Sequence, residues 1–126
     1  MSKVKVLYIE DNFDNMTLVK RVLEIEGFEV IEAETGTEGL QKASENQPDI
    51  IITDINLPGI DGYEVTNTLK KDRHTAHIPV IAMTANVMQR DRDSVFKAGC
   101  DGFISKPIDI DDLPLKIQNF LEGKSR

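Results

Sequence analysis

Five short apolar runs alternate along this chain with five longer segments of helical periodicity, and this alternation restricts the possible fold more than any other feature. The apolar runs have the length and the β-branched and aromatic content of strands. Three of them are almost continuously apolar, as is typical of parallel strands covered on both faces. The expected strands are residues 4–9, 29–33, 49–54, 78–83 and 102–105. The expected helices lie at about residues 16–25, 37–46, 63–71, 87–98 and 110–121.

Strict alternation with short connections predicts an α/β fold, a three-layer sandwich in which helices cover both faces of one parallel sheet. Five such units fit the flavodoxin-like strand order 2-1-3-4-5, in which strands 1 and 3 are neighbours. No repeat or linker interrupts the pattern, so residues 1–126 are expected to form a single domain. Ligands of such sheets bind outside the carboxyl ends of the strands, which is therefore where functional residues are expected.

Composition excludes several classes of function. The formal charge of −7 and the scattered basic residues argue against direct binding to nucleic acid. There is no apolar run near the ~18 residues of a membrane span, and the N-terminus lacks the apolar core of a signal peptide. Cys100 is the only cysteine, so an internal disulfide is impossible and the reducing cytoplasm is the expected location.

Polar residues follow four of the five expected strands. Glu10 and Asp11 follow strand 1, Asp54 ends strand 3, Thr84 follows strand 4 and Lys106 follows strand 5. In the expected strand order Asp11 and Asp54 come from adjacent strands, about 5 Å apart. Three carboxylates facing one lysine leave the pocket short of positive charge, and a hard, oxygen-seeking dication would relieve this. The pattern therefore indicates an Mg²⁺ site.

The same residues suit phosphoryl transfer to a carboxylate. Asp54 can attack phosphorus as a nucleophile and become an aspartyl-phosphate. The transferred group needs its charge neutralised and its oxygens held by hydrogen-bond donors. The ion on Asp11 and the charge of Lys106 would meet the first need, and the hydroxyl of Thr84 would help to meet the second.

Taken together, these residues resemble the receiver domain of bacterial two-component response regulators, over residues 4 to about 121. The resemblance implies that Asp54 is the phosphoacceptor and that the receiver is a switch rather than an enzyme. The ligands it implies for the ion are the carboxylates of Asp11 and Asp54, the backbone carbonyl of Asn56 and, through water, Glu10. It also implies a cis peptide bond before Pro107 and a switch formed by Thr84 and Phe103.

By the same resemblance, a histidine kinase or a histidine phosphotransfer protein would supply the phosphoryl group. A downstream protein would read the face built from the fourth helix, the fifth strand and the fifth helix, with the chain as a monomer or a phosphorylation-dependent dimer. Stand-alone cell-cycle regulators and the receivers of hybrid kinases are the most similar members. Met1, just before the first strand, favours a small intact protein.

Two other functions remain open. A phosphohydrolase of the haloacid dehalogenase type also uses an aspartyl nucleophile with Mg²⁺, but it needs a second Asp two residues later, where this chain has Asn56. A receiver-like interaction module would keep the fold without phosphorylation. Taken singly, Asp54 could be a turn former, Thr84 a strand residue and Phe103 a core residue.

Overall fold

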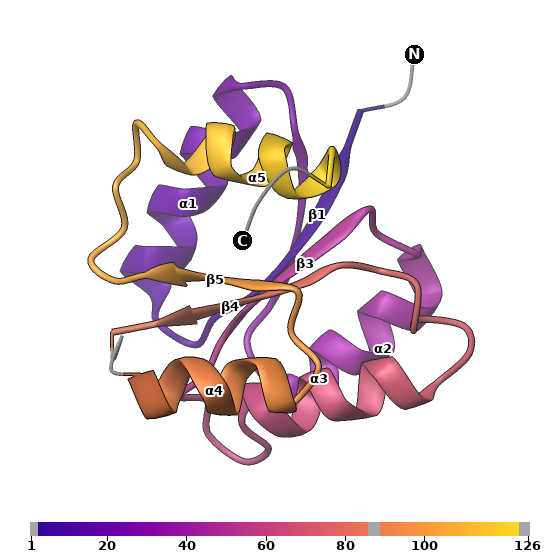
Figure 1. The fold of residues 1–126 in the computed structure, drawn as a ribbon. Helices are drawn as coiled ribbons and strands as arrows, with labels where there is room; N and C mark the ends of the chain where they lie inside the picture. Colours follow the sequence, from indigo (N-terminus) through magenta and orange to yellow (C-terminus); the bar gives the residue numbers. More distant parts are fainter. Residues whose placement is uncertain (1–2, 86–88, 124–126) are drawn as a thin grey trace.

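The computed structural model describes residues 3–85 and 89–123 and contains one five-stranded parallel sheet of order β2-β1-β3-β4-β5 (Figure 1). The strands are β1 (Lys5–Ile9), β2 (Glu29–Ala33), β3 (Ile50–Asp54), β4 (Val80–Thr84) and β5 (Gly102–Ser105). The helices are α1 (Phe13–Ile25), α2 (Gly36–Asn46), α3 (Gly62–Lys71), α4 (Gln89–Lys97) and α5 (Leu113–Leu121). The predicted strand order is confirmed.

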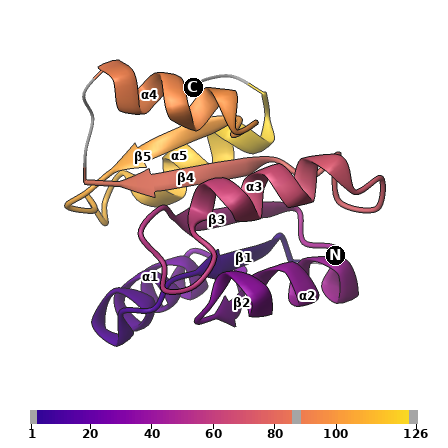
Figure 2. The same ribbon diagram turned by 90° about the horizontal axis from the view of Figure 1, so that it is seen from below.

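Helices cover both faces of the sheet. Figures 1 and 2 show α1 and α5 together on one face and α2, α3 and α4 on the other. Along β1, Val6 and Tyr8 face the first layer and Leu7 and Ile9 face the second, and all four are fully buried. Because both faces of the strand are covered, both sets must be apolar, which explains why the run is continuous. The three-layer sandwich is confirmed.

Helix α1 begins earlier than the apolar spacing around Met16 indicated. The side chain of Asn12 accepts a hydrogen bond from the backbone N–H of Asn15 at 2.9 Å and so caps the first turn. At the other end, Gly27 has φ of 93° and the N–H of Phe28 bonds the carbonyl of Leu23. This glycine stop is the one expected from the sequence.

Helix α5 begins at Leu113, later than the predicted start at Ile110. The side chain of Asp109 accepts the N–H groups of Asp111 and Asp112, and these bonds hold a turn where the helix was expected. Pro114 lies in the first helical turn, where it leaves no hydrogen bond unmade.

The fourth helix is described from Gln89 onward, so its predicted start at residues 87 and 88 lies outside the described residues. Strand β4 extends one residue further than predicted, through Thr84, which pairs in register with Ser105 of β5. No helix among the residues that the structure describes combines the length and the apolar character that crossing a bilayer requires.

Candidate functional site

Asp54 is the last residue of β3, and the residue is almost fully buried at 4% exposure. The backbone N–H of Asn56 donates to its Oδ1 at 3.1 Å. The chain then turns back so closely that a Cβ on Gly62 would lie 2.5 Å from the carbonyl oxygen of Asp54. Glycine at this position therefore lets the start of α3 close over the end of β3 and hold the Asp54 backbone.

Glu10 and Asp11 follow β1, which is the neighbour of β3. Carboxylate oxygens of Glu10, Asp11 and Asp54 all lie within 4.8 Å of one another. Glu10 is buried at 1% exposure, whereas Asp11 is exposed at the mouth of the cluster. Three oxygen donors this close repel one another and fit a hard dication such as Mg²⁺, which prefers carboxylate ligands.

Lys106 supplies positive charge to this cluster from the end of β5. Its Nζ lies 2.6 Å from Oδ2 of Asp54 and 3.4 Å from Oε1 of Glu10. Burial lowers the pKa of Lys106, but the hydrogen bond and the charge of Asp54, together with Glu10, outweigh it and raise the pKa overall. The ammonium group thus stays charged and offsets one of the three carboxylates.

Burial raises the pKa of Glu10, and the nearby Asp54 raises it further, while Lys106 and Tyr8 act in the opposite direction. The hydroxyl of Tyr8 donates to Oε1 of Glu10 at 3.0 Å, and the side-chain amide of Asn15 donates to the same oxygen at 3.3 Å. Sequence reasoning missed both donors. The available signal was a tyrosine, which carries a hydroxyl, inside an otherwise apolar strand.

Thr84 ends β4 beside the cluster and is buried at 6% exposure. Its carbonyl accepts a hydrogen bond of 2.8 Å from the backbone N–H of Lys106, which joins the ends of β4 and β5. The peptide bond between Lys106 and Pro107 is cis, as the resemblance implied.

Phe103 lies apart from the carboxylates, on the face of the sheet that α4 covers. It is half-buried and packs against the core cluster of that layer. Its ring meets that of Phe96 of α4 edge to face, with centroids 6.3 Å apart. Sequence reasoning proposed a switch at Phe103 but missed Phe96 as its neighbour.

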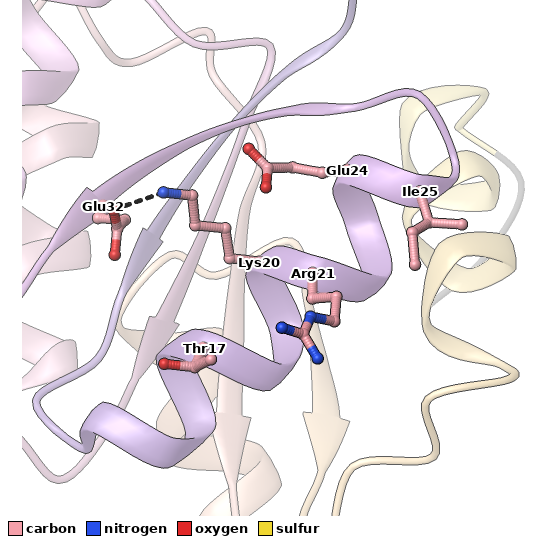
Figure 3. Close-up of a pocket in the computed structure, with 6 residues that line it drawn as sticks. All are labelled: Thr17, Lys20, Arg21, Glu24, Ile25 and Glu32. Carbon is pink, nitrogen blue, oxygen red and sulfur yellow. Dashed lines mark hydrogen bonds and ion pairs between the residues drawn. The ribbon is translucent and has the colours of Figure 1, made fainter.

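A hollow of about 200 Å³ opens beside Lys106 and is lined by Asn15, Leu18, Lys106, Pro107 and Ile108. A second hollow, of about 480 Å³, lies on the outer side of α1 and contains no residue of the carboxylate cluster (Figure 3). There an ion pair of 2.9 Å between Lys20 and Glu32 joins α1 to the edge strand β2. Of these two hollows, the first is therefore the one that includes a residue of the candidate site, Lys106.

Comparison with known proteins gives concordant findings. A model of the response regulator receiver domain matches residues 6–118. The polar-differentiation response regulator DivK of Brucella ovis is 42% identical over 116 residues, 92% of this chain and 94% of that relative. A CheY-like receiver domain protein of Methanospirillum hungatei is similar in structure, with 30% identity and a TM-score of 0.88 over 98% of this chain and 97% of that one. The receiver domain of the sensor histidine kinase PA1611 of Pseudomonas aeruginosa, crystallised with magnesium in its active site cleft, is 29% identical with a TM-score of 0.88, over 96% of this chain and 99% of that one.

Proposed function

The chain belongs to the response regulator receiver domain family of two-component signalling, and we propose that Asp54 accepts a phosphoryl group while Mg²⁺ is bound beside it. One observation carries the proposal. The buried carboxylate of Asp54 lies within 4.8 Å of two further carboxylates and 2.6 Å from the ammonium of Lys106. A nucleophile, a cation site and a counter-charge therefore lie within one small volume.

The donor is the phosphohistidine of a kinase or of a phosphotransfer protein. A carboxylate oxygen of Asp54 bonds to phosphorus as the phosphorus–nitrogen bond breaks. The electron pair of that bond stays on the imidazole, which leaves neutral when its other nitrogen carries a proton. No oxidant or further co-reactant is needed, because the phosphoryl group moves from one nucleophile to another.

The ion would be held by Asp11, Asp54 and the backbone carbonyl of Asn56, with Glu10 acting through water. Bound there, Mg²⁺ would supply positive charge to the transferring phosphoryl oxygens. Lys106 offsets the remaining charge, and the hydroxyl of Thr84 donates to a phosphoryl oxygen. Magnesium in the active site cleft of the Pseudomonas receiver supports the choice of ion.

Exposed apolar side chains support docking of a protein donor. Among the described residues, the exposed large hydrophobic side chains all lie on α1 or around the start of α5: Phe13, Leu18, Ile25, Ile110 and Leu115. Phe13 is 79% exposed in the first turn of α1, next to the acidic pair, and Leu18 lines the hollow beside Lys106. A phosphodonor helix that covers these residues would bring its histidine to Asp54.

Output passes through the face formed by α4, β5 and α5. The phosphoryl group on Asp54 carries negative charge, and the hydroxyl of Thr84 can turn toward it. The side chain of Phe103, on the neighbouring strand β5, can then change its position. The ring contact between Phe103 and Phe96 supports this route, because it connects β5 to α4. A few kcal/mol of bias is enough for such a two-state element. The resulting surface would bind a downstream protein in the cytoplasm or a second copy of the chain.

The test is phosphorylation in vitro. The protein is incubated with acetyl phosphate and Mg²⁺, and the intact mass is measured with and without excess EDTA. We expect one phosphoryl group in the wild type and in Asp72→Asn, an exposed control at the end of α3, and none in Asp54→Asn or in EDTA. Label that persists in Asp54→Asn would overturn the assignment. An unlabelled wild type would favour an interaction module that works without phosphorylation.

A further inference from the structure

Tyr8 is a buried tyrosine that the phosphoryl-transfer chemistry does not use. It lies in the inner strand β1, between β2 and β3, with no exposed surface, on the face covered by α1 and α5. Its hydroxyl donates to Oε1 of Glu10 at 3.0 Å and lies 3.5 Å from the sulfur of Met83. Burying a hydroxyl is costly unless it forms a hydrogen bond, and an apolar side chain would fill this space without that cost. The contact with Glu10 is therefore what the hydroxyl adds.

Donors from four parts of the chain surround the Glu10 carboxylate. Oε1 accepts from Tyr8 at 3.0 Å, from Asn15 at 3.3 Å and from Lys106 at 3.4 Å. Oε2 accepts from the backbone N–H of Asn12 at 3.3 Å. With Oε1 occupied by three donors, Glu10 is fixed at the back of the cluster. This arrangement is more suitable for a carboxylate whose role is to orient its neighbours than for a carboxylate that binds the ion directly.

We propose that Tyr8, assisted by Asn15, is a positioning residue that holds Glu10 so that Glu10 orients Lys106 and the water shell of the ion. The role of Tyr8 in phosphoryl transfer rests on the function proposed above. The positioning of Glu10 by Tyr8 does not depend on that function, because the hydrogen bonds to Glu10 exist in the unphosphorylated protein. Among the donors to Oε1, Tyr8 makes the shortest contact and comes from the sheet interior, so it restrains Glu10 most.

Removing the hydroxyl should weaken magnesium binding through Glu10. In Tyr8→Phe the ring still fills its space, but the Glu10 carboxylate loses the donor that restrains its orientation. We expect the dissociation constant for Mg²⁺ to rise about threefold to tenfold, as for the loss of part of one charged hydrogen bond. Asn15→Ala, at the edge of the cluster, should act in the same direction with a smaller effect.

A double-mutant cycle tests the route of this effect. Mg²⁺ is titrated into the unphosphorylated protein and followed by NMR in the wild type, Tyr8→Phe, Glu10→Gln and the double variant. We expect Tyr8→Phe to weaken Mg²⁺ binding in the wild-type background. In the Glu10→Gln background, the same substitution should lower the Mg²⁺ affinity by less than about twofold. Tyr63→Phe removes the only other tyrosine hydroxyl in the chain and should leave binding unchanged. Equal losses in both backgrounds, or no loss in Tyr8→Phe, would overturn the proposal.

Two further readouts separate the possible causes. With acetyl phosphate, Tyr8→Phe should raise the Mg²⁺ concentration for half-maximal labelling and leave the rate at saturating Mg²⁺ within about twofold. If Met83→Leu weakened magnesium binding as much as Tyr8→Phe, the sulfur contact would be the cause and the proposal would fail. If the wild type accepted no phosphoryl group but the titration cycle showed coupling, the proposed function would fail and the positioning by Tyr8 would stand.

Discussion

The Nζ of Lys106 lies 2.6 Å from Oδ2 of Asp54, so a single ion pair connects β5 to β3 across the end of the intervening strand β4. Both groups are largely withdrawn from water, with 21% and 6% of their side chains exposed. Removing one partner of such a pair costs more than the pair itself contributes, because the other charge loses its compensation. The contact therefore links the stability of the protein to the chemistry of its site.

Replacement of Lys106 tests this link. In Lys106→Met the aliphatic stem remains but the charge is lost, which leaves three carboxylates together. We expect the free energy of unfolding to fall by about 1–3 kcal/mol without Mg²⁺ and the loss to shrink when Mg²⁺ is added. Urea unfolding with and without Mg²⁺ measures both effects. Equal stability of the variant and the wild type without the ion would contradict this account.

Asp11 and Glu10 should contribute unequally to magnesium binding. Asp11 is exposed at the mouth of the cluster, whereas Glu10 is buried and occupied by hydrogen-bond donors. We expect Asp11→Asn to weaken Mg²⁺ binding about 100-fold and Glu10→Gln about tenfold. NMR titration of the unphosphorylated variants gives both dissociation constants. Similar losses in the two variants would mean that both carboxylates bind the ion in the same way.

Activation should change the surroundings of Phe103. When beryllofluoride, which mimics the phosphoryl group, is added with Mg²⁺, we expect NMR shifts near Asp54 and also at Phe103 and Phe96. In Thr84→Ala the shifts near Asp54 should remain, and those at the two rings should fall to less than about half. Shifts confined to the Asp54 pocket in the wild type would show that this switch does not operate.

Gly62 should tolerate no side chain. A Cβ there would lie 2.5 Å from the carbonyl oxygen of Asp54 and 2.8 Å from Cα of Ile55, and neither backbone atom can move freely. We expect Gly62→Ala to lower the free energy of unfolding by about 1–3 kcal/mol and to slow the labelling of Asp54. Gly59→Ala is the control, since Gly59 has a positive φ but open space around it. A larger loss in Gly59→Ala would mean that backbone strain matters more than crowding.

Burial raises the pKa of the Cys100 thiol; a hydrogen bond with Thr66 lowers it and the charge of Asp101 raises it, with a net increase. The folded state therefore keeps the thiol proton at a pH where the unfolded chain loses it. This contribution to stability is complete below the unfolded pKa of about 9 and is lost as pH rises through the folded value. Between pH 8 and pH 10, urea unfolding should show a steeper loss of stability in the wild type than in Cys100→Ala. Parallel curves would contradict this.

Much of the fold could be predicted because local pattern and topology agree. The alternation of runs indicated a parallel sheet and fitted the strand order 2-1-3-4-5, and that order places Glu10, Asp11, Asp54 and Lys106 at one edge of the sheet. These expectations follow from the periodicity of the sequence and from the rule that ligands bind at the carboxyl ends of parallel strands.

Two contacts were missed for different reasons. Tyr8 and Glu10 are only two residues apart, so they lie on the same side of the strand, but Tyr8 was read as an apolar strand residue and its hydroxyl was not considered. The contact between Phe96 and Phe103 depends on how α4 packs on the sheet, which the pattern of the sequence does not specify. The start of α5 was wrong because the Asp109 side chain stabilises a turn, a local alternative that competes with helix formation.

The proposed donor surface lies on α1 and around the start of α5, and the proposed output face is formed by α4, β5 and α5, so α2 is left free for labelling. Ser44 is exposed on α2, in the layer opposite α1 and α5. Because Cys100 is buried and is the only cysteine, Ser44→Cys would provide a single accessible thiol. A fluorophore or a sensor chip attached there would report on donor and partner binding without blocking either surface.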